Sequence, residues 1–337
     1  MVVNQSFVEN INITHYSCKK IRLIIVLNFV YAFDENYNDQ AYVSICSLIE
    51  NIDVDCHISI IHKDSETFKN KKEKLEKLFK NLTVDLHTFL KEDIFLPNLE
   101  EVHVSEATYY RLFFDKYLNR NIKNYIYIDA DVICLNNPEE KINKVFKKMQ
   151  KEKYVIAART ESIVFENEKQ RRRKIGVEKN YFNAGIMFVN YEKLLEEKIY
   201  ENLRIKLIDI NDSIKFWDQD VLNSFFNGNY LELDNSLNYD PNIYKDKFKY
   251  DKPVVTYFLH YQGSNKPWTV NGVFGKYAKY YHYYFKKYEL GEYHITSTWK
   301  KEAFLQFVNN VITFKFLKLS NPFKYLTSVI SYLIGKN

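Results

Sequence analysis

The 337-residue sequence predicts an α/β fold built on a doubly wound, mostly parallel sheet flanked by helices. Three observations support this prediction. Apolar runs of strand length, such as 21–33, are almost continuous, which is typical of strands covered on both faces. Segments with helical periodicity lie between these runs, as in βαβ units. Gly (8) and Pro (6) are scarce and no linker interrupts the chain, so the first 280 or so residues are expected to form one domain.

The expected elements follow one another along the chain. Strands are predicted at 21–33, 56–63, 83–89 and within 124–138, then at 153–158, 185–190 and 254–260. Helices are predicted around 43–49, at 65–82 and 106–118, then at 191–210 and 218–228. Ser65 is expected to cap its helix and Gly228 to end the last one. Beyond residue 150 the strand order is expected to become mixed.

The net charge of +5 comes from 48 basic and 43 acidic residues. Residues 300–337 contain six lysines and one glutamate, so this segment carries the whole excess and the remainder is formally neutral. A nucleic-acid groove spread over the body of the protein is therefore not expected.

A cytoplasmic location is expected from two observations. The cysteines (18, 46, 56 and 134) are scattered and form no CxxC pair, which favours a reducing compartment. The apolar run 21–33 is too short to span a bilayer and starts too far from Met1 to resemble a secretion signal.

Glycine positions exclude two common nucleotide-binding motifs from the first half of the chain. The first glycine is Gly176, so the N-terminal βαβ units contain neither GxGxxG nor a Walker A loop. If this sheet binds a nucleotide, the charge of its phosphates needs another partner. A divalent cation held by carboxylates is the economical alternative.

Asp129 and Asp131 supply such carboxylates. They interrupt the buried run "NYIYIDADVICL" one residue apart, and are expected to project to the same side at the end of a strand, where open α/β sheets bind ligands. Their hard oxygen atoms suit Mg²⁺ or Mn²⁺. A solvated turn at a strand end is the alternative explanation of this short pattern.

Three further stretches add polar groups that can serve a ligand. "YFNAGIMFVN" places Asn183, Ala184 and Gly185 in a small-residue turn ahead of a buried strand. "WDQDVLN" places Asp218, Gln219 and Asp220 at a helix start, where one acid can be an N-cap. "HYQGSNKPW" brings an imidazole, a glycine and a lysine, at positions 260, 263 and 266. The imidazole can complete a mixed N,O metal site, although a histidine in this setting, taken alone, is more often a packed side chain.

These four motifs, in this order and spacing, resemble the retaining glycosyltransferases of family 8, which include glycogenin and bacterial lipopolysaccharide α-galactosyl- and α-glucosyltransferases. "VYAFDENY" at 30–37 is similar to the first strand and the uridine-contacting turn of that family. The match covers roughly residues 22 to 270. It implies a single GT-A domain with a Rossmann-like mixed sheet, a UDP-sugar donor, and Mn²⁺ or Mg²⁺.

The resemblance also implies a role for each matching residue. Metal ligands would be Asp129, Asp131 and His260. Ala32, Asp34, Asn36 and Tyr37 would lie along the uridine, the backbone of Ala130 near the ribose, and Gly263 and Lys266 at the diphosphate. Arg111, Asn183, Ala184, Asp218 and Gln219 would face the sugar. The family has an aspartate after the strand here written "YVIAA"; this chain has "RTES", so Glu161 is the candidate and the identity of the hexose is open.

Two mechanisms agree with retention of configuration: a double displacement, or attack on the same face that the leaving group departs from. The first needs a carboxylate nucleophile. In the family the nearest side chain is an amide, here Gln219, and an amide is a poor nucleophile. Same-face attack with a phosphate oxygen as base is therefore favoured, and Asp218 is an alternative nucleophile.

Two basic segments each have two interpretations. The run 166–176 is a solvated helix or loop, or a lid over the donor. Residues 300–337 alternate aromatic or aliphatic residues with lysine, and Pro322 divides them. They either pack on the domain as two helices or rest on anionic lipid, which is slightly favoured.

We therefore expect three parts: an N-terminal extension (1–20), the GT-A domain (21–280) and a basic aromatic C-terminal segment (281–337) on the inner face of the cell membrane. The expected enzyme is a metal-dependent hexosyltransferase that moves galactose or glucose from its UDP-sugar to a lipooligosaccharide, a lipopolysaccharide or another cell-surface glycan. Alternatives are transfer to a protein acceptor, as by glycogenin, and a non-catalytic module that binds a nucleotide sugar.

Overall fold

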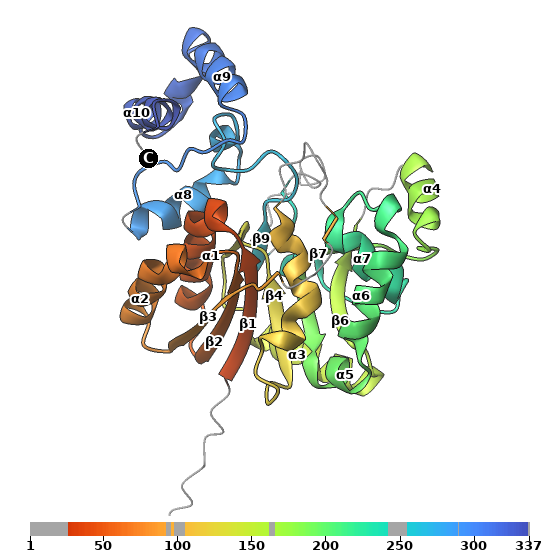
Figure 1. The fold of residues 1–337 in the computed structure, drawn as a ribbon. Coiled ribbons are helices and arrows are strands. Elements are labelled where there is room, and N and C mark those ends of the chain that lie inside the picture. The colour runs from red at the N-terminus through yellow and green to blue at the C-terminus, as the bar shows by residue number, and fades with distance from the viewer. Residues whose placement is uncertain are drawn as a thin grey trace, which may run out of the picture.

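The computed structural model describes residues 26–91, 96–97, 105–161, 166–241, 255–288 and 290–335, so the predicted N-terminal extension lies outside it. Its centre is a seven-stranded sheet of order β3-β2-β1-β4-β7-β6-β8 (Figure 1). The strands are β1 (Val26–Phe33), β2 (Asp55–His62), β3 (Leu82–Thr88), β4 (Asn124–Ile128), β6 (Ile156–Thr160), β7 (Phe182–Asn190) and β8 (Leu231–Glu232). The first four in chain order are parallel and β7 is antiparallel to β4 and β6, which confirms a sheet that becomes mixed after residue 150.

Helices cover both faces of this sheet. One face packs against α1 (Asn38–Glu50), α2 (Lys69–Leu78) and α3 (Glu139–Glu152). The other packs against the 3₁₀ segment η3 (Glu106–Lys116), α5 (Tyr191–Glu196), α6 (Ile199–Asp209) and α7 (Trp217–Phe226). Ile126 and Ile128 of β4 enter the first core, while Tyr125 and Tyr127 enter the second. Burial of each such side chain contributes about 1.5–3 kcal/mol, and the use of both faces explains why these strands are almost continuously apolar.

A smaller antiparallel sheet consists of β5 (Val132–Cys134) and β9 (Phe258–His260). Between β4 and β5 the chain turns through 129–131, with the Asp129 amide donating to the carbonyl oxygen of Gly185 at 2.8 Å. Asp129 and Asp131 therefore follow the end of a strand and their carboxylates lie on one side, as predicted, but the backbone between them is a turn and no longer a strand. They lie in a turn where the chain passes from the large sheet to the small one.

Other local expectations also need correction. The helix expected at 65–82 begins as the 3₁₀ segment η2 (Ser65–Phe68), and Asp64 rather than Ser65 holds the N-cap position. The helix expected at 191–210 divides into α5 and α6 because Lys198 adopts a left-handed conformation, with φ +51°. Residues 183–185 lie inside β7 and form no turn before it. The end of α7 is as predicted, with Gly228 at φ +78°.

The C-terminal helices lie beyond α8 (Ala278–Lys287), away from the main sheet (Figure 1). They are α9 (Lys300–Ile312) and α10 (Pro322–Leu333), joined by η7 (Lys315–Lys318). Tyr325 and Val329 of α10 pack with Val270 and Ile295 in a core of their own. Within the described residues, no helix combines the length and the apolar character that crossing a membrane requires.

The remaining elements are α4 (Glu166–Lys174), η1 (Glu35–Tyr37), η4 (Asn211–Ser213), η5 (Asn235–Leu237) and η6 (Gly272–Phe274).

Candidate active site

Two carboxylates and one imidazole meet at the junction of the two sheets. Potential ligand atoms of Asp129, Asp131 and His260 all lie within 4.8 Å of one another. The register of the small sheet brings them together, because Val132 pairs with His260 and the amide of Tyr261 donates to the carbonyl oxygen of Asp131. Residues far apart in the sequence thus converge on one point.

Three features of this cluster fit a divalent cation. His260 Nδ1 lies 2.9 Å from the amide oxygen of Asn238, so Nδ1 carries the hydrogen and the Nε2 lone pair faces the carboxylates. Asp131 Oδ1 is buried 3.2 Å from that Nε2 and accepts no well-formed hydrogen bond. A Cβ on Gly185 would meet His260 Cε1 at 2.2 Å and Asp129 Oδ2 at 2.7 Å, so only glycine leaves the space open. Carboxylate and imidazole ligands suit Mn²⁺, and the carboxylates also suit Mg²⁺.

A lysine neutralises the cluster from the loop after β9. Lys266 Nζ pairs with Asp131 Oδ2 and donates to the carbonyl oxygen of Tyr261 at 2.6 Å. Burial alone would raise the pKa of Asp131, but the charge of Lys266 lowers it well below its usual range. Gly263 of the same loop is exposed and has φ +73°, a conformation that glycine adopts readily. Lys266 therefore lies where its ammonium group could release the carboxylate of Asp131 and bind another anion instead.

Arg111 is buried behind the cluster. Its Nε lies 2.8 Å from Asp218 Oδ2, and its Nη2 lies 3.3 Å from Asp129 Oδ1. Its Nη1 donates to the carbonyl oxygen of Ala184 at 2.5 Å. The guanidinium also lies 4.1 Å from the centre of the Tyr127 ring, whose hydroxyl donates to Asp129 at 2.6 Å. Burial raises the pKa of Asp218 to about 7, and the Arg111 charge acts against that shift. Arg111 thus holds both carboxylates in position.

The amide of Gln219, in the first turn of α7, is hydrogen-bonded at both its oxygen and its nitrogen. Its Oε1 accepts from the backbone amide of Ala184 at 2.9 Å, and its Nε2 donates to Glu161 Oε1 at 3.0 Å. Asn183 Nδ2 lies 3.4 Å from the same Oε1, and Asn183 Oδ1 accepts from Asn238 at 3.0 Å. Because Asn238 also holds His260, these residues form one network with the cluster of Asp129, Asp131 and His260.

The residues expected along the uridine gather where β1 ends. Ala32 is in β1, and the buried Asp34 caps η1 by accepting from the backbone amide of Asn36 at 3.0 Å. The ring of Tyr37 meets that of Trp268 edge-on, with 6.2 Å between centroids. Trp268 is two residues from Lys266, so this end adjoins the cluster. Ala130, expected near the ribose, lies between the two carboxylates.

Sequence reasoning missed three residues of this site. Tyr127 precedes Asp129 by two positions, and a polar tip on a buried strand next to a charge was a usable signal. Asn238 follows the short segment η5 and has no such signal. Arg172 lies in the basic run, where nothing distinguishes it from its neighbours, yet it pairs with Glu161 at 2.6 Å.

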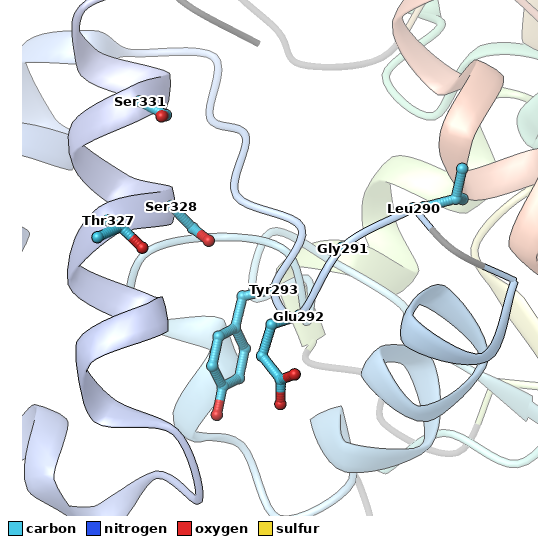
Figure 2. Close-up of a pocket in the computed structure, with 7 residues that line it drawn as sticks. All are labelled: Leu290, Gly291, Glu292, Tyr293, Thr327, Ser328 and Ser331. Carbon is cyan, nitrogen blue, oxygen red and sulfur yellow. The ribbon is translucent and has the colours of Figure 1, made fainter.

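A separate hollow of about 210 Å³ lies between α10 and the segment before α9 (Figure 2). It is lined by Leu290, Gly291, Glu292, Tyr293, Thr327, Ser328 and Ser331, and by none of the predicted site residues. Glu292 is the lining residue with a carboxylate, and this carboxylate is already bound by Lys286 at 2.9 Å and by Asn321. We attribute this hollow to the packing of the C-terminal helices.

The mixed sheet, with a D-x-D turn at the end of its central strand β4, matches the GT-A fold of the solved galactosyltransferase described below. The model of Glycosyl transferase family 8 matches residues 28–272, and the chain belongs to this family.

Relatives agree with this assignment, and a solved structure has a similar fold. The chain is 29% identical over 257 residues to the lipopolysaccharide 1,2-glucosyltransferase of Escherichia coli K12, and the match covers 72% of each chain. It is 28% identical over 260 residues to the lipopolysaccharide 1,3-galactosyltransferase of Salmonella typhimurium LT2, again over 72% of each. The galactosyltransferase LgtC, solved with donor and acceptor sugar analogues, has a similar fold, with a TM-score of 0.64 at 20% identity over 82% of this chain and 100% of that one. The predicted family, fold and hexosyltransferase class are confirmed.

Proposed function

We propose that the enzyme transfers galactose or glucose from a UDP-sugar to a glycan acceptor, with retention of configuration. The convergence of Asp129, Asp131 and His260, with an unpartnered oxygen on Asp131, is the observation that carries this proposal. The names of the two relatives, which specify these sugars and lipopolysaccharide, support the donor and acceptor class.

In this proposal the three cluster residues hold Mn²⁺ or Mg²⁺. The bound cation would supply electrostatic stabilisation of the charge that develops on the departing UDP. Lys266 would leave Asp131 and pair with a diphosphate oxygen, beside the open backbone of Gly263. The remaining donor contacts are assigned as the resemblance implies: Ala32, Asp34, Asn36 and Tyr37 along the uridine, and the Ala130 backbone at the ribose.

The sugar-facing side chains favour attack on the face from which UDP departs. A double displacement needs a free carboxylate, but the side chain of Asp218 is 3% exposed and is bound by Arg111. We therefore assign to both residues the role of holding the site in shape, and not that of nucleophile. The Oε1 of Gln219 would instead stabilise positive charge at the anomeric carbon, with Asn183 and Glu161 at the sugar hydroxyls. The bond from the anomeric carbon to the phosphate oxygen breaks, the acceptor oxygen bonds to that carbon, and its proton passes to the departing phosphate.

We also propose that α9 to α10 rest on anionic lipid at the cytoplasmic face of a membrane, which makes a lipid-linked acceptor the favoured substrate. Phe314, Leu317 and Phe323 are 67%, 56% and 73% exposed, and lysines 315, 318 and 324 lie among them. Exposed apolar side chains with interspersed lysines are typical of helices that lie in a membrane surface.

UDP release tests the central proposal. The enzyme is incubated with Mn²⁺ and, in turn, with UDP-galactose, UDP-glucose, UDP-N-acetylgalactosamine and UDP-N-acetylglucosamine. Each donor is tested with and without a short saccharide acceptor. Faster UDP release from galactose or glucose donors is expected. Failure to turn over any of the four, even slowly to water, would contradict the proposal.

A further inference from the structure

Helix α4 contains three consecutive arginines with different environments. Arg173 is exposed, Arg171 is half-buried, and Arg172 is only 6% exposed. A buried guanidinium costs several kcal/mol unless a partner compensates for its lost hydration. A solvated helix would not bury Arg172, so its contacts call for a specific explanation.

Arg172 contacts both acceptors of the Gln219 amide group without touching Gln219 itself. Its Nη2 lies 2.6 Å from Glu161 Oε2, and its guanidinium lies 3.8 Å from the centre of the Tyr181 ring. Gln219 Nε2 donates to Glu161 Oε1 at 3.0 Å and to the Tyr181 hydroxyl at 3.3 Å. Arg172 therefore orders the two groups that receive the two amide hydrogens.

The partners of the amide determine which way it faces. The backbone amide of Ala184 can only donate, and it bonds to Gln219 Oε1 at 2.9 Å. An ionised Glu161 can only accept, so it selects Nε2. Burial raises the pKa of Glu161, and the Arg172 charge opposes this rise. A protonated Glu161 could instead donate to the amide oxygen and would permit the flipped orientation.

The second acceptor is controlled from the same helix. The Tyr181 hydroxyl donates its hydrogen to Asp220 Oδ1 at 2.7 Å, so its oxygen remains available to accept from Gln219. Arg171 holds Asp220 through two bonds of 2.8 and 3.0 Å. Helix α4 thus orders both acceptors: Arg172 contacts Glu161 and the Tyr181 ring, and Arg171 holds the Asp220 that binds the Tyr181 hydroxyl.

We infer that Arg172 is a positioning residue that sets the orientation of the Gln219 amide, with its oxygen, rather than its NH₂ group, available to the sugar. This inference rests on the proposed function, which places Gln219 beside the anomeric carbon. It assigns the basic run an ordered role inside the site, different from either a solvated helix or a lid that opens and closes.

Turnover of the wild type, Arg172→Met, Arg172→Lys and the matched control Arg173→Met tests this role. We expect kcat of Arg172→Met to fall about 10- to 100-fold, because a misplaced catalytic group loses up to that factor, while KM for the UDP-sugar changes less than about threefold. Arg172→Lys should recover part of the loss, and Arg173→Met should match the wild type. A loss confined to KM, or equal losses in the two methionine variants, would overturn the inference.

A double-mutant cycle separates positioning from general support of the fold. In a Gln219→Ala background, Arg172→Met should cause no further loss of kcat, because the amide that it orders is absent. A multiplicative loss would overturn the inference. If Arg172→Met does not fold, Arg172→Gln replaces it in the cycle, since it removes the charge that pairs with Glu161 but keeps a side chain that can form hydrogen bonds.

Hydrogen exchange of the Gln219 side-chain NH₂ provides a readout without substrate, which keeps this inference distinct from the proposed function. The NMR signals are assigned by their absence in Gln219→Ala. Exchange should be at least about tenfold faster in Arg172→Met than in the wild type and Arg173→Met, because one hydrogen-bond acceptor is released. Equal rates would overturn the positioning role even if the enzyme is active, whereas absent turnover with this rate difference would contradict the proposed function alone.

Discussion

The proposed donor site and the C-terminal helices depart from the usual distribution of residues in opposite ways. In the donor site charged side chains are buried: those of Arg111 and Asp218 are 4% and 3% exposed. In the C-terminal helices apolar side chains are exposed: Ile312 and Phe323 are 70% and 73% exposed. Each arrangement is costly in water alone, so each indicates a ligand that removes the cost. A cation with a diphosphate would do so in the first region, and a lipid surface in the second.

This comparison predicts that substitutions in the two regions affect different properties. Arg111→Met should cause the largest loss of stability, because it leaves the buried carboxyl group of Asp218 without its partner and removes one contact of Asp129. We expect the free energy of unfolding, measured by urea titration, to fall by about 3–5 kcal/mol.

The matched control is Arg204→Met, which removes a second arginine–aspartate pair. Arg204 lies 2.8 Å from Asp115, but their side chains are 24% and 19% exposed. A loss of about 1 kcal/mol or less is expected there. Equal stability of the two variants would contradict the expectation that the buried Arg111–Asp218 pair costs more to break than the more exposed Arg204–Asp115 pair.

As the pH falls, the protein should first lose stability at α8, where His282 lies in the helix and the ring of His294 stacks on Phe285, and only later at the proposed donor site. Burial lowers the pKa of His282 and of His294 to about 4. Between pH 6.5 and 4 the unfolded chain therefore binds two protons that the folded chain does not, so stability falls as pH falls, by about 1.4 kcal/mol per pH unit for each histidine. Asp131, whose pKa is lowered, keeps its contribution above its ordinary pKa and loses it only in stronger acid.

The measurement is the free energy of unfolding across this range for the wild type and His282→Gln. The glutamine can still donate to the carbonyl oxygen of Pro267, which His282 contacts at 2.9 Å. The slope against pH should decrease by about 1.4 kcal/mol per unit in the variant. An unchanged slope would show that His282 is not neutral in the folded protein.

Exposed apolar residues of the C-terminal helices should affect lipid binding and little else. The triple variant Phe314→Ser, Leu317→Ser and Phe323→Ser should bind phosphatidylglycerol vesicles at least about tenfold more weakly, since each buried side chain contributes more than 1 kcal/mol. UDP release with a soluble acceptor should stay near the wild-type rate. Vesicle sedimentation measures the binding.

The control replaces Ile205 and Ile208 of α6, which are 57% and 67% exposed, by serine. It removes exposed apolar side chains from another part of the surface and should bind vesicles like the wild type. Equal losses in both variants, or no binding by the wild type, would refute a membrane role for the C-terminal helices.

The sequence was most informative where chemistry-bearing residues follow strand ends. Asp129, Asp131 and His260 could be selected in this way, and the structure brings them together. Their geometry could not be predicted, because the turn between the two sheets depends on the pairing of Val132 with His260, which is distant in sequence.

Burial within one helix was also beyond local reasoning. Arg172 and Arg173 are identical neighbours, and only the position of Glu161 and Tyr181 against α4 decides that the first is buried and the second exposed. Hydrophobic periodicity describes apolar positions well, but it contains no information on which charge finds a partner.

Calorimetric titration of UDP tests the central claim most directly. Wild-type enzyme should bind UDP at least about tenfold more tightly with Mn²⁺ than with a chelator, which is about 1.4 kcal/mol of metal-dependent affinity. Asp131→Asn should lose this difference, while Asp212→Asn, at an exposed position in η4, should keep it. Retention of the Mn²⁺ effect in Asp131→Asn, or its absence in the wild type, would contradict a metal-dependent donor site at the turn between β4 and β5.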